Sequence, residues 1–366
     1  MYKEGDHAEA DIPVDVAAVT ACISVTQKEN GEIPWSKDDK TDPWDHVEAA
    51  MGLTIGGEYG CARQAFEWMR WMQLEDGSWY SAYRNGLPED CTRDTNMATY
   101  IAVGLYHYYL TTGDYGFLET MWETVRKGID FALAFQQPTG EFYWAMSPEG
   151  VVEQKALLTG SSSVYMSLKC AVSIAIVLEK EHTAWVRAMV TLKDALATRP
   201  HLFDQTKSRF SMDGFYPVLT GAVTGAVAQQ RIESCLARYF VAGQGVKCVD
   251  DEPWITIAET SELCLAIAAA GDRRRAARIF GLLQDYRYPD GSYWCGFTIP
   301  ERTIWPEEKI SWTNAVVLMA ADAIYRLTPA AGLFDHDFWQ NAGRAAELRG
   351  AFSGDSKTSV PAAINY

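Results

Sequence analysis

Four short acidic clusters stand where helices are predicted to begin, and three of them lie beside tryptophan. They occupy residues 42–48 (Asp-Pro-Trp-Asp-His-Val-Glu), 91–96 (Cys-Thr-Arg-Asp-Thr-Asn), 250–262 and 305–315. Cleavage of an acetal needs little more than two carboxyl groups, because one protonates the leaving oxygen and the other activates water or attacks carbon. Aromatic faces and hydrogen-bonding carboxylates can hold the sugar rings. The clusters therefore predict one shared cavity equipped for glycoside cleavage, with no cofactor.

Two of the clusters place an aspartate at a predicted helix start. Asp45 follows Pro43 and Trp44, where free backbone N–H groups can hold a carboxylate. It is either the helix N-cap or a working carboxylate at the mouth of a barrel, with Trp44 stacking on a sugar. Asp94 can likewise cap its helix or contact substrate, and its neighbour Arg93 can hold another acid.

The third cluster places two glutamates on one face of an apolar helix. Glu259 and Glu262 are three residues apart and have mainly apolar neighbours. Burial would raise the pKa of such a carboxyl group, which suits a general acid. The alternative is an ion pair with an arginine such as Arg231 or Arg93.

The fourth cluster places Glu307 and Glu308 on a loop between Trp305 and Trp312. The functional interpretation is a pair of acids at the shared cavity, framed by indole rings, and the alternative is a solvated loop charge. Thirteen tryptophans in 366 residues are above ordinary use, so some of them are expected to form stacking platforms for sugars.

The elements that must position these residues are helices. Apolar residues recur at spacings of three and four in about eleven segments, namely 16–27, 46–55, 60–73, 97–111, 115–135, 163–178, 184–197, 232–242, 255–269, 273–286 and 312–327. Turns that contain Gly followed by aromatic residues recur between them, near residues 27–35, 73–80, 137–144, 203–216 and 288–294. Such internal similarity indicates an array of like units. We therefore predict an all-α fold, an (α/α)6 toroid, with residues 1–342 as one catalytic domain and residues 343–366 as a flexible tail.

Composition narrows the partners and the location. A net charge of −16 disfavours nucleic acid and anionic membrane surfaces. The eight cysteines form no Cys-x-x-Cys pair, and the six histidines show no metal-ligand spacing, so we expect no metal. With no apolar signal-peptide run, the expected location is the cytoplasm. An oligosaccharide or polysaccharide is the expected partner, and a homodimer is compatible with the sequence.

Residues 12–327 resemble the glucoamylase-type (α/α)6 glycoside hydrolases. Residues 94–133 are similar to the third and fourth helices of that group, and residues 305–315 are similar to its base motif, which implies Glu307 as the base. Trp44-Asp45 resembles its sugar-binding element without the arginine. The acid of the family follows a tryptophan as Glu-Glu, whereas Trp144 is followed here by Ala145 and Met146. The resemblance therefore implies that the acid has moved to Glu262 or Asp45, or that the chemistry is lost.

Two further resemblances concern substrate. The Gly-Ser-Trp turns are similar to those of squalene-hopene cyclases and prenyltransferase β subunits, which implies a terpenoid cyclase with Asp250 as proton donor. The closest match to the cyclase acidic motif, however, begins with Cys248. In size and helical layout the chain also resembles the mycobacterial methylmannose polysaccharide hydrolases. That resemblance implies endo-hydrolysis of α-(1→4)-linked 3-O-methylmannose chains.

The sequence thus favours an inverting glycoside hydrolase acting on an intracellular α-linked polysaccharide. Asp45 and Glu262 are the predicted catalytic pair, with Glu307 as an alternative base. The predicted substrate-binding residues are Trp35, Trp44, Arg93, Asp94, Trp254, Glu259 and Trp305. A terpenoid cyclase and a non-catalytic glycan-binding toroid, the latter motivated by Ala145, are the alternatives.

Overall fold

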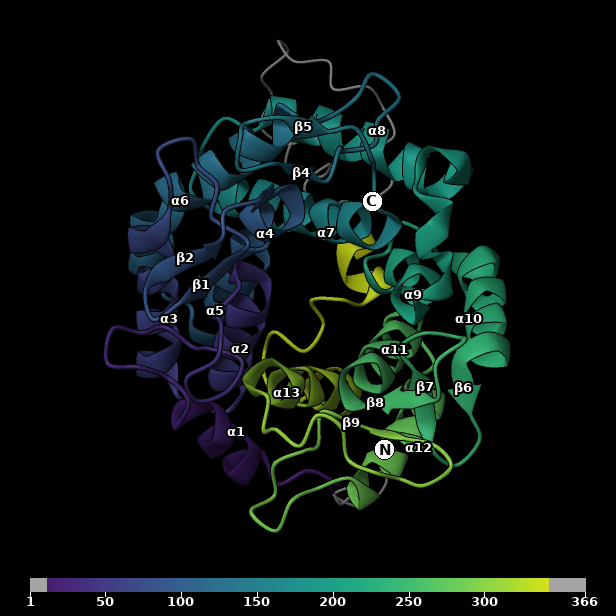
Figure 1. Ribbon diagram of the computed structural model, residues 1–366. Helices are drawn as coiled ribbons and strands as arrows, with labels where there is room; N and C mark the ends of the chain where they lie inside the picture. Colours follow the sequence, from purple (N-terminus) through teal and green to yellow (C-terminus); the bar gives the residue numbers. More distant parts are fainter. Residues whose placement is uncertain (1–11, 342–366) are drawn as a thin grey trace, which may run out of the picture.

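Two concentric rings of helices form the molecule (Figure 1). The computed structural model describes residues 12–341, so the predicted tail at 343–366 lies outside the described residues. The inner ring consists of α2 (Pro43–Ile55), α4 (Thr95–Thr99) continued by α5 (Ile101–Thr112), α7 (Leu158–Val177), α9 (Ser211–Leu219), α11 (Ile257–Ala269) and α13 (Ser311–Tyr325). The outer ring consists of α1 (Val16–Ser24), α3 (Tyr59–Met72), α6 (Tyr115–Leu133), α8 (Thr183–Thr198), α10 (Gly225–Tyr239) and α12 (Arg273–Phe280). The chain alternates between outer and inner helices, and α13 packs against α1 and α2 to close the ring, which confirms the predicted (α/α)6 toroid.

The two rings differ in how far they are buried. Every residue of α11 is buried, because an inner helix touches protein on nearly all sides. Helix α3, in the outer ring, buries one face only. Among the described helices, α7 is long and apolar enough to cross a membrane, but 78% of that stretch is buried inside the ring. An apolar inner helix is what this architecture requires.

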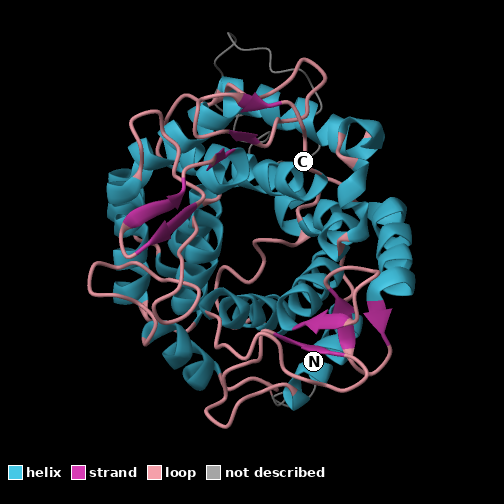
Figure 2. Ribbon diagram, in the orientation of Figure 1, coloured by secondary structure: helices cyan, strands magenta, loops and turns pink. Residues whose placement is uncertain are grey.

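Short antiparallel strands decorate one end of the rings (Figure 2). The first sheet pairs β1 (Ala82–Arg84) with β2 (Leu87–Asp90), and the second has the order β3 (Arg93–Asp94), β4 (Ala145–Met146), β5 (Val152–Glu153). The third has the order β6 (Phe240–Val241), β7 (Gly245–Lys247), β8 (Trp254–Thr256), β9 (Gly296–Thr298). Strands β3 and β8 lead directly into α4 and α11, so they fix where these inner helices begin. Three short 3₁₀ helices complete the fold: η1 (Pro200–Leu202), η2 (Gln205–Arg209) and η3 (Gly281–Asp285).

The recurring Gly turns fasten neighbouring outer helices to each other, and we call them clasps. In the clasp at 73–77, Gln73 Nε2 donates to the carbonyl oxygens of Gly77 (3.0 Å) and of Thr124 on α6 (2.9 Å). Gly77 has φ +93°, and a Cβ there would lie 2.2 Å from the Lys127 carbonyl oxygen. Only glycine therefore fits this turn.

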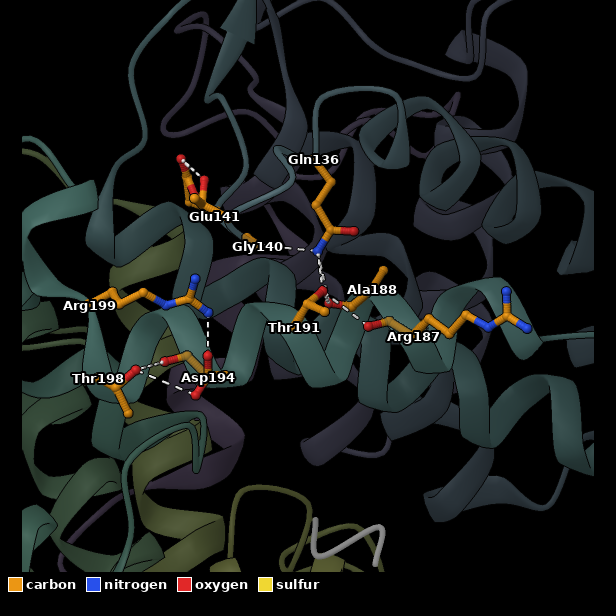
Figure 3. Close-up of polar contacts among 10 residues, drawn as sticks. Gln136, Gly140, Glu141, Arg187, Ala188, Thr191, Asp194, Thr198 and Arg199 are labelled. Carbon is orange, nitrogen blue, oxygen red and sulfur yellow. Dashed lines mark hydrogen bonds and ion pairs between the residues drawn. The ribbon is translucent and has the colours of Figure 1, made fainter. Parts of the chain in front are cut away.

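The same contacts recur in two other clasps. Gln27 Nε2 donates to the carbonyl oxygens of Gly31 and of Cys61 on α3. Gln136 Nε2 donates to the carbonyl oxygens of Gly140 and of Ala188 on α8 (Figure 3). Gln136 stands one residue before the predicted turn at 137–144. The clasps are structural, because each one ties the end of one outer helix to the next.

The predicted turn at 203–216 is wrong, because this segment contains most of an inner helix. Helix α9 starts at Ser211 and continues through Pro217 to Leu219. Gly214 followed by Phe215 and Tyr216 matches the Gly–aromatic pattern of the other turns, which is the basis of that prediction. A Cβ at Gly214 would lie 3.0 Å from Cys235 Sγ, so the glycine allows α10 to pack closely.

Candidate active site

Two adjoining cavities open at the end of the toroid where the inner helices begin. The larger has a volume of about 600 Å³ and the smaller about 230 Å³. They share Trp44, Asp94 and Trp144. First-turn residues of α2, α4, α7 and α9 line them. Helix N-termini therefore converge on this space, and their partial positive charge favours negatively charged groups.

Asp45 lines the larger cavity and is not the N-cap of α2, which was one of the two alternatives for it. Helix α2 begins at Pro43, and Asp42 is the cap, because its Oδ1 accepts from the Asp45 backbone N–H at 2.9 Å. Asp42 is itself held by Trp35 Nε1 at 2.7 Å. Burial raises the pKa of Asp45 well above its usual value, and the charges of Asp42 and Glu48 raise it further. Asp45 therefore does not cap the helix, and its side chain is partly accessible from the cavity.

Glu48 lies one turn deeper on the same face of α2 as Asp45. Its Oε1 accepts from Trp44 Nε1 at 2.9 Å and from Tyr100 Oη at 3.3 Å. Burial raises its pKa to about 8, although these two hydrogen bonds act in the opposite direction. Glu48 is not among the residues predicted from the sequence, although its spacing of three from Asp45 was a usable signal.

Glu262 reaches the same cluster from the other side of the ring. Tyr216 Oη, on α9, donates to Glu262 Oε1 at 2.5 Å, and the Tyr216 ring lies 5.8 Å from the Trp44 ring. Burial raises the pKa of Glu262 well above its usual value, and the charges of Glu48 and Glu259 raise it further. Tyr216 was missed because α9 had been predicted to be a turn.

The predicted arginine partners do not reach the two glutamates. Arg231 donates instead to the backbone carbonyls of Asp213 and Gly214, and Arg93 donates to Asp76 at 2.9 Å. Glu259 is 8% exposed, and its Oε2 has no hydrogen-bond partner among the described residues. A buried carboxylate oxygen without a partner is suited to bind a hydroxyl group or water.

Asp94 both caps α4 and lines the two cavities. Its Oδ1 accepts from the backbone N–H groups of Asn96 (2.6 Å) and Met97 (3.2 Å). Burial raises the pKa of Asp94 to about 6, against the effect of these hydrogen bonds. Arg93, bound to Asp76, lies outside the lining of both cavities.

The remaining predicted aromatic residues and Glu307 lie on the rim. Trp35 lines the larger cavity and packs edge-on against Trp312 at 5.9 Å. Trp254 and Trp305 form a separate edge-to-face pair at 5.1 Å, and Trp305 is 57% exposed. Glu307 is exposed on the same loop and belongs to the lining of neither cavity. The structure thus groups Asp45, Trp35, Trp44 and Asp94 on one cavity, and it connects Glu262 to them through Tyr216.

The same structure bears on the alternatives. Asp250, the proton donor of the cyclase hypothesis, forms a surface ion pair with Arg238. Residues 12–341 contain no cluster of three or more His, Cys, Asp or Glu side chains that could hold a metal ion. All eight cysteines are free thiols.

Solved structures of glycosidases share the toroidal fold of this chain. A solved glycosidase (wild type) superimposes with a TM-score of 0.67 at 14% identity, covering 89% of this chain and 100% of that one. A GH63 mannosylglycerate hydrolase from Thermus thermophilus gives 0.64 at 12% identity, covering 83% and 98%. At such low identity these two comparisons show the fold alone.

Sequence comparison then gives the family. The chain is 44% identical over 322 residues to the MMP endo-(1,4)-3-O-methyl-alpha-D-mannosidase of Mycolicibacterium hassiacum, covering 88% of this chain and 89% of that one. It is also 24% identical over 226 residues to an uncharacterized glycosyl hydrolase of Methanocaldococcus jannaschii, covering 57% of this chain and 34% of that one. No protein-family model matches the sequence. The chain is a glycoside hydrolase and belongs to the family of the methylmannose polysaccharide endo-mannosidase.

Proposed function

We propose that this enzyme hydrolyses internal α-(1→4) linkages of 3-O-methylmannose polysaccharide by an inverting mechanism. The observation that carries the proposal is the 44% identity to an endo-mannosidase of that substrate over nearly the whole chain. The cavity supports it, because it offers carboxyl groups and indole rings on one accessible surface. Asp45 and Glu262 are the proposed catalytic pair.

The surroundings of the two carboxyl groups suggest their roles. Glu262 is buried in the body of α11 beside Glu48 and Glu259, so it holds its proton and serves as the general acid. Asp45 lies in the first turn of α2 and lines the larger cavity, where water can reach it, so it is the proposed base. Burial and the charges of Asp42 and Glu48 raise its pKa, and the helix N-terminus acts in the opposite direction. Inversion requires about 6.5–9.5 Å between the two carboxyl groups to leave room for that water.

Substrate contacts follow from the same arrangement. Trp35 and Trp44 line the larger cavity and provide the apolar faces on which sugar rings stack. Asp94 lines both cavities and offers acceptors for hydroxyl groups. Glu259 lines neither cavity, and its proposed role is to raise the pKa of Glu262. Trp254 and Trp305 form a rim platform for a part of the polysaccharide farther from the cleaved bond. We further propose a cytoplasmic location, which is supported by the eight free thiols.

The test is incubation of the purified protein with α-glucans, α-mannans and O-methylated mannose oligosaccharides, followed by mass spectrometry of the products. Shortened chains of intermediate length from the methylated substrate support endo-hydrolysis, and NMR of the fresh products reports inversion. Release of monosaccharide alone would show exo action. Binding of a glycan without any cleavage would instead establish a glycan-binding toroid, for which Ala145 in the family's acid position is the motive.

A further inference from the structure

The smaller cavity differs from the larger one in chemistry. Most of its wall surface is apolar and includes Trp44, Phe142, Trp144, Leu157, Phe210 and Met212. Polar residues also line it, among them Asp94, Lys207 and Asp213. The larger cavity is lined by many charged groups, including Asp42, Asp45, Lys40, Arg84 and Glu89. Because the two cavities share Trp44, Asp94 and Trp144, one bound chain can extend from the charged space into the apolar one.

One polar atom at the smaller cavity lacks a partner. Asn96 lines this cavity, is 3% exposed, and its Oδ1 has no hydrogen-bond partner among the described residues. Two other polar residues of the lining are already paired, because Thr159 Oγ1 donates to Asp213 Oδ1 at 2.6 Å. A buried amide oxygen without a partner is costly unless a ligand supplies a donor. The site therefore suits a ligand that presents one hydroxyl group to Asn96 and apolar surface to the walls.

We propose that the smaller cavity is the subsite that selects an O-methylated sugar residue over an unmethylated one; the inference rests on the proposed function. The methyl group lies against Leu157, Phe210 and Met212, while a free hydroxyl group of the same residue donates to Asn96 Oδ1. A methyl ether gains from contact with apolar walls. An unmethylated hydroxyl group in the same place would lose its hydrogen bonds to water without replacement.

Two matched substrates test this subsite. They are α-(1→4)-mannose oligosaccharides of equal length, one with 3-O-methyl groups and one without. The ratio of their kcat/KM values is expected to be about 10- to 200-fold in favour of the methylated one, which is the range for a single methyl-sized group in an apolar pocket. A ratio near one, with both substrates cleaved, would overturn the inference and leave the proposed hydrolase intact.

Two variants locate the selectivity. Leu157→Asn and Met212→Gln keep side-chain length but place an amide in the apolar wall, and asparagine is a favourable residue at position 157, the N-cap of α7. Both are expected to lower the ratio about 5- to 20-fold, mainly by raising KM for the methylated substrate. Trp71→Ala is the control, because Trp71 is 68% exposed on the outer helix α3. Unchanged ratios in both folded variants would contradict the placement.

A binding experiment separates the two proposals. Calorimetry of the two oligosaccharides with the wild-type protein measures selectivity without turnover, and it needs no variant that could fail to fold. If neither substrate is cleaved but the methylated one binds at least about 10-fold more tightly, the proposed hydrolysis fails and the subsite stands. Equal affinities would overturn the subsite.

Discussion

Carboxyl groups of the outer clasps have lowered pKa values, whereas those around the inner cavity have raised pKa values. In the clasps, hydrogen bonds from Lys309 and Ser292 lower the pKa of Asp290 to about 2. Against the effect of burial, hydrogen bonds from Ser78 and Arg93 lower the pKa of Asp76. Behind the cavity wall, where Glu48 accepts a hydrogen bond from Trp44, burial raises the pKa of Glu48 to about 8.

The tryptophans of the two regions differ in the same way. Trp79 follows a clasp, is fully buried, and donates its Nε1 proton to the Met69 carbonyl oxygen at 2.7 Å. Trp44 is partly accessible, lines both cavities, and donates to the carboxylate of Glu48. The acids and indoles of the clasps thus form hydrogen bonds within the fold. The cavity retains acids that can carry a proton near neutral pH, which is what acid–base catalysis needs.

Loss of the proposed catalytic pair is expected to give the largest effect. Glu262→Gln and Asp45→Asn should each lower kcat about 10²- to 10⁴-fold while the melting temperature stays near that of the wild type. A substrate with a good leaving group needs no protonation, so it should restore Glu262→Gln but not Asp45→Asn. Asp290→Asn, in a clasp, is the control with near-normal activity. Near-normal rates in either cavity variant would remove that residue from the mechanism.

A methyl group in a clasp tests the other side of the comparison. Gly77→Ala would place Cβ against the Lys127 carbonyl oxygen at positive φ, so the free energy of unfolding should fall by roughly 2–4 kcal/mol. Gly113 also has positive φ but open space around its Cβ position, so Gly113→Ala should lose only about 1 kcal/mol. Urea unfolding measures both. Equal losses would show that the contact with α6 does not matter, and the activity of the folded fraction should not change in either variant.

The raised pKa of Glu48 predicts a pH dependence of stability. Between pH 4.5, its ordinary pKa, and about 8 the folded protein binds a proton that the unfolded chain does not, so this contribution to stability falls as the pH rises. Glu48→Gln cannot titrate at this position. The difference in the free energy of unfolding between this variant and the wild type should therefore shift in favour of the variant by roughly 1–3 kcal/mol from pH 5.5 to pH 8. Urea unfolding at the two pH values measures it. A constant difference between the two proteins would contradict a proton held by Glu48.

The smallest expected effect comes from the hydroxyl group that joins α9 to Glu262. Tyr216→Phe removes a donor that lowers the pKa of Glu262, so that pKa should rise further. Because Glu262 is the proposed acid, the alkaline limb of the kcat/KM profile should move to higher pH, with about a 10-fold loss at the optimum. Comparison of the pH profiles of kcat/KM for Tyr216→Phe and for the wild type tests this shift. A limb that does not move would assign the alkaline pKa to another group.

Periodicity and turns made most of the fold predictable. Apolar spacing located most of the inner and outer helices, and the recurring Gly turns indicated an array of like units. Helix α9 was missed because Gly214, Phe215 and Tyr216 match the Gly–aromatic pattern of the turns, whereas Gly214 in fact lets α10 pack closely against this helix. Ranking the acids was harder, because Glu307 and Glu262 both follow tryptophan-containing segments, yet one is exposed on a loop and the other is buried.

The sequence by itself determined the ring of helix pairs and the clasps, because these depend on local periodicity and on glycines that must adopt positive φ. It also supplied Asp45 and Glu262 as candidates. Only the tertiary structure decided which acids share one environment. Tyr216 meets Glu262 across 46 residues and Trp44 across the ring, and the proton affinity of a carboxyl group depends on such burial and on its charged neighbours. Those neighbours come from helices α2, α9 and α11, whose proximity no local pattern records.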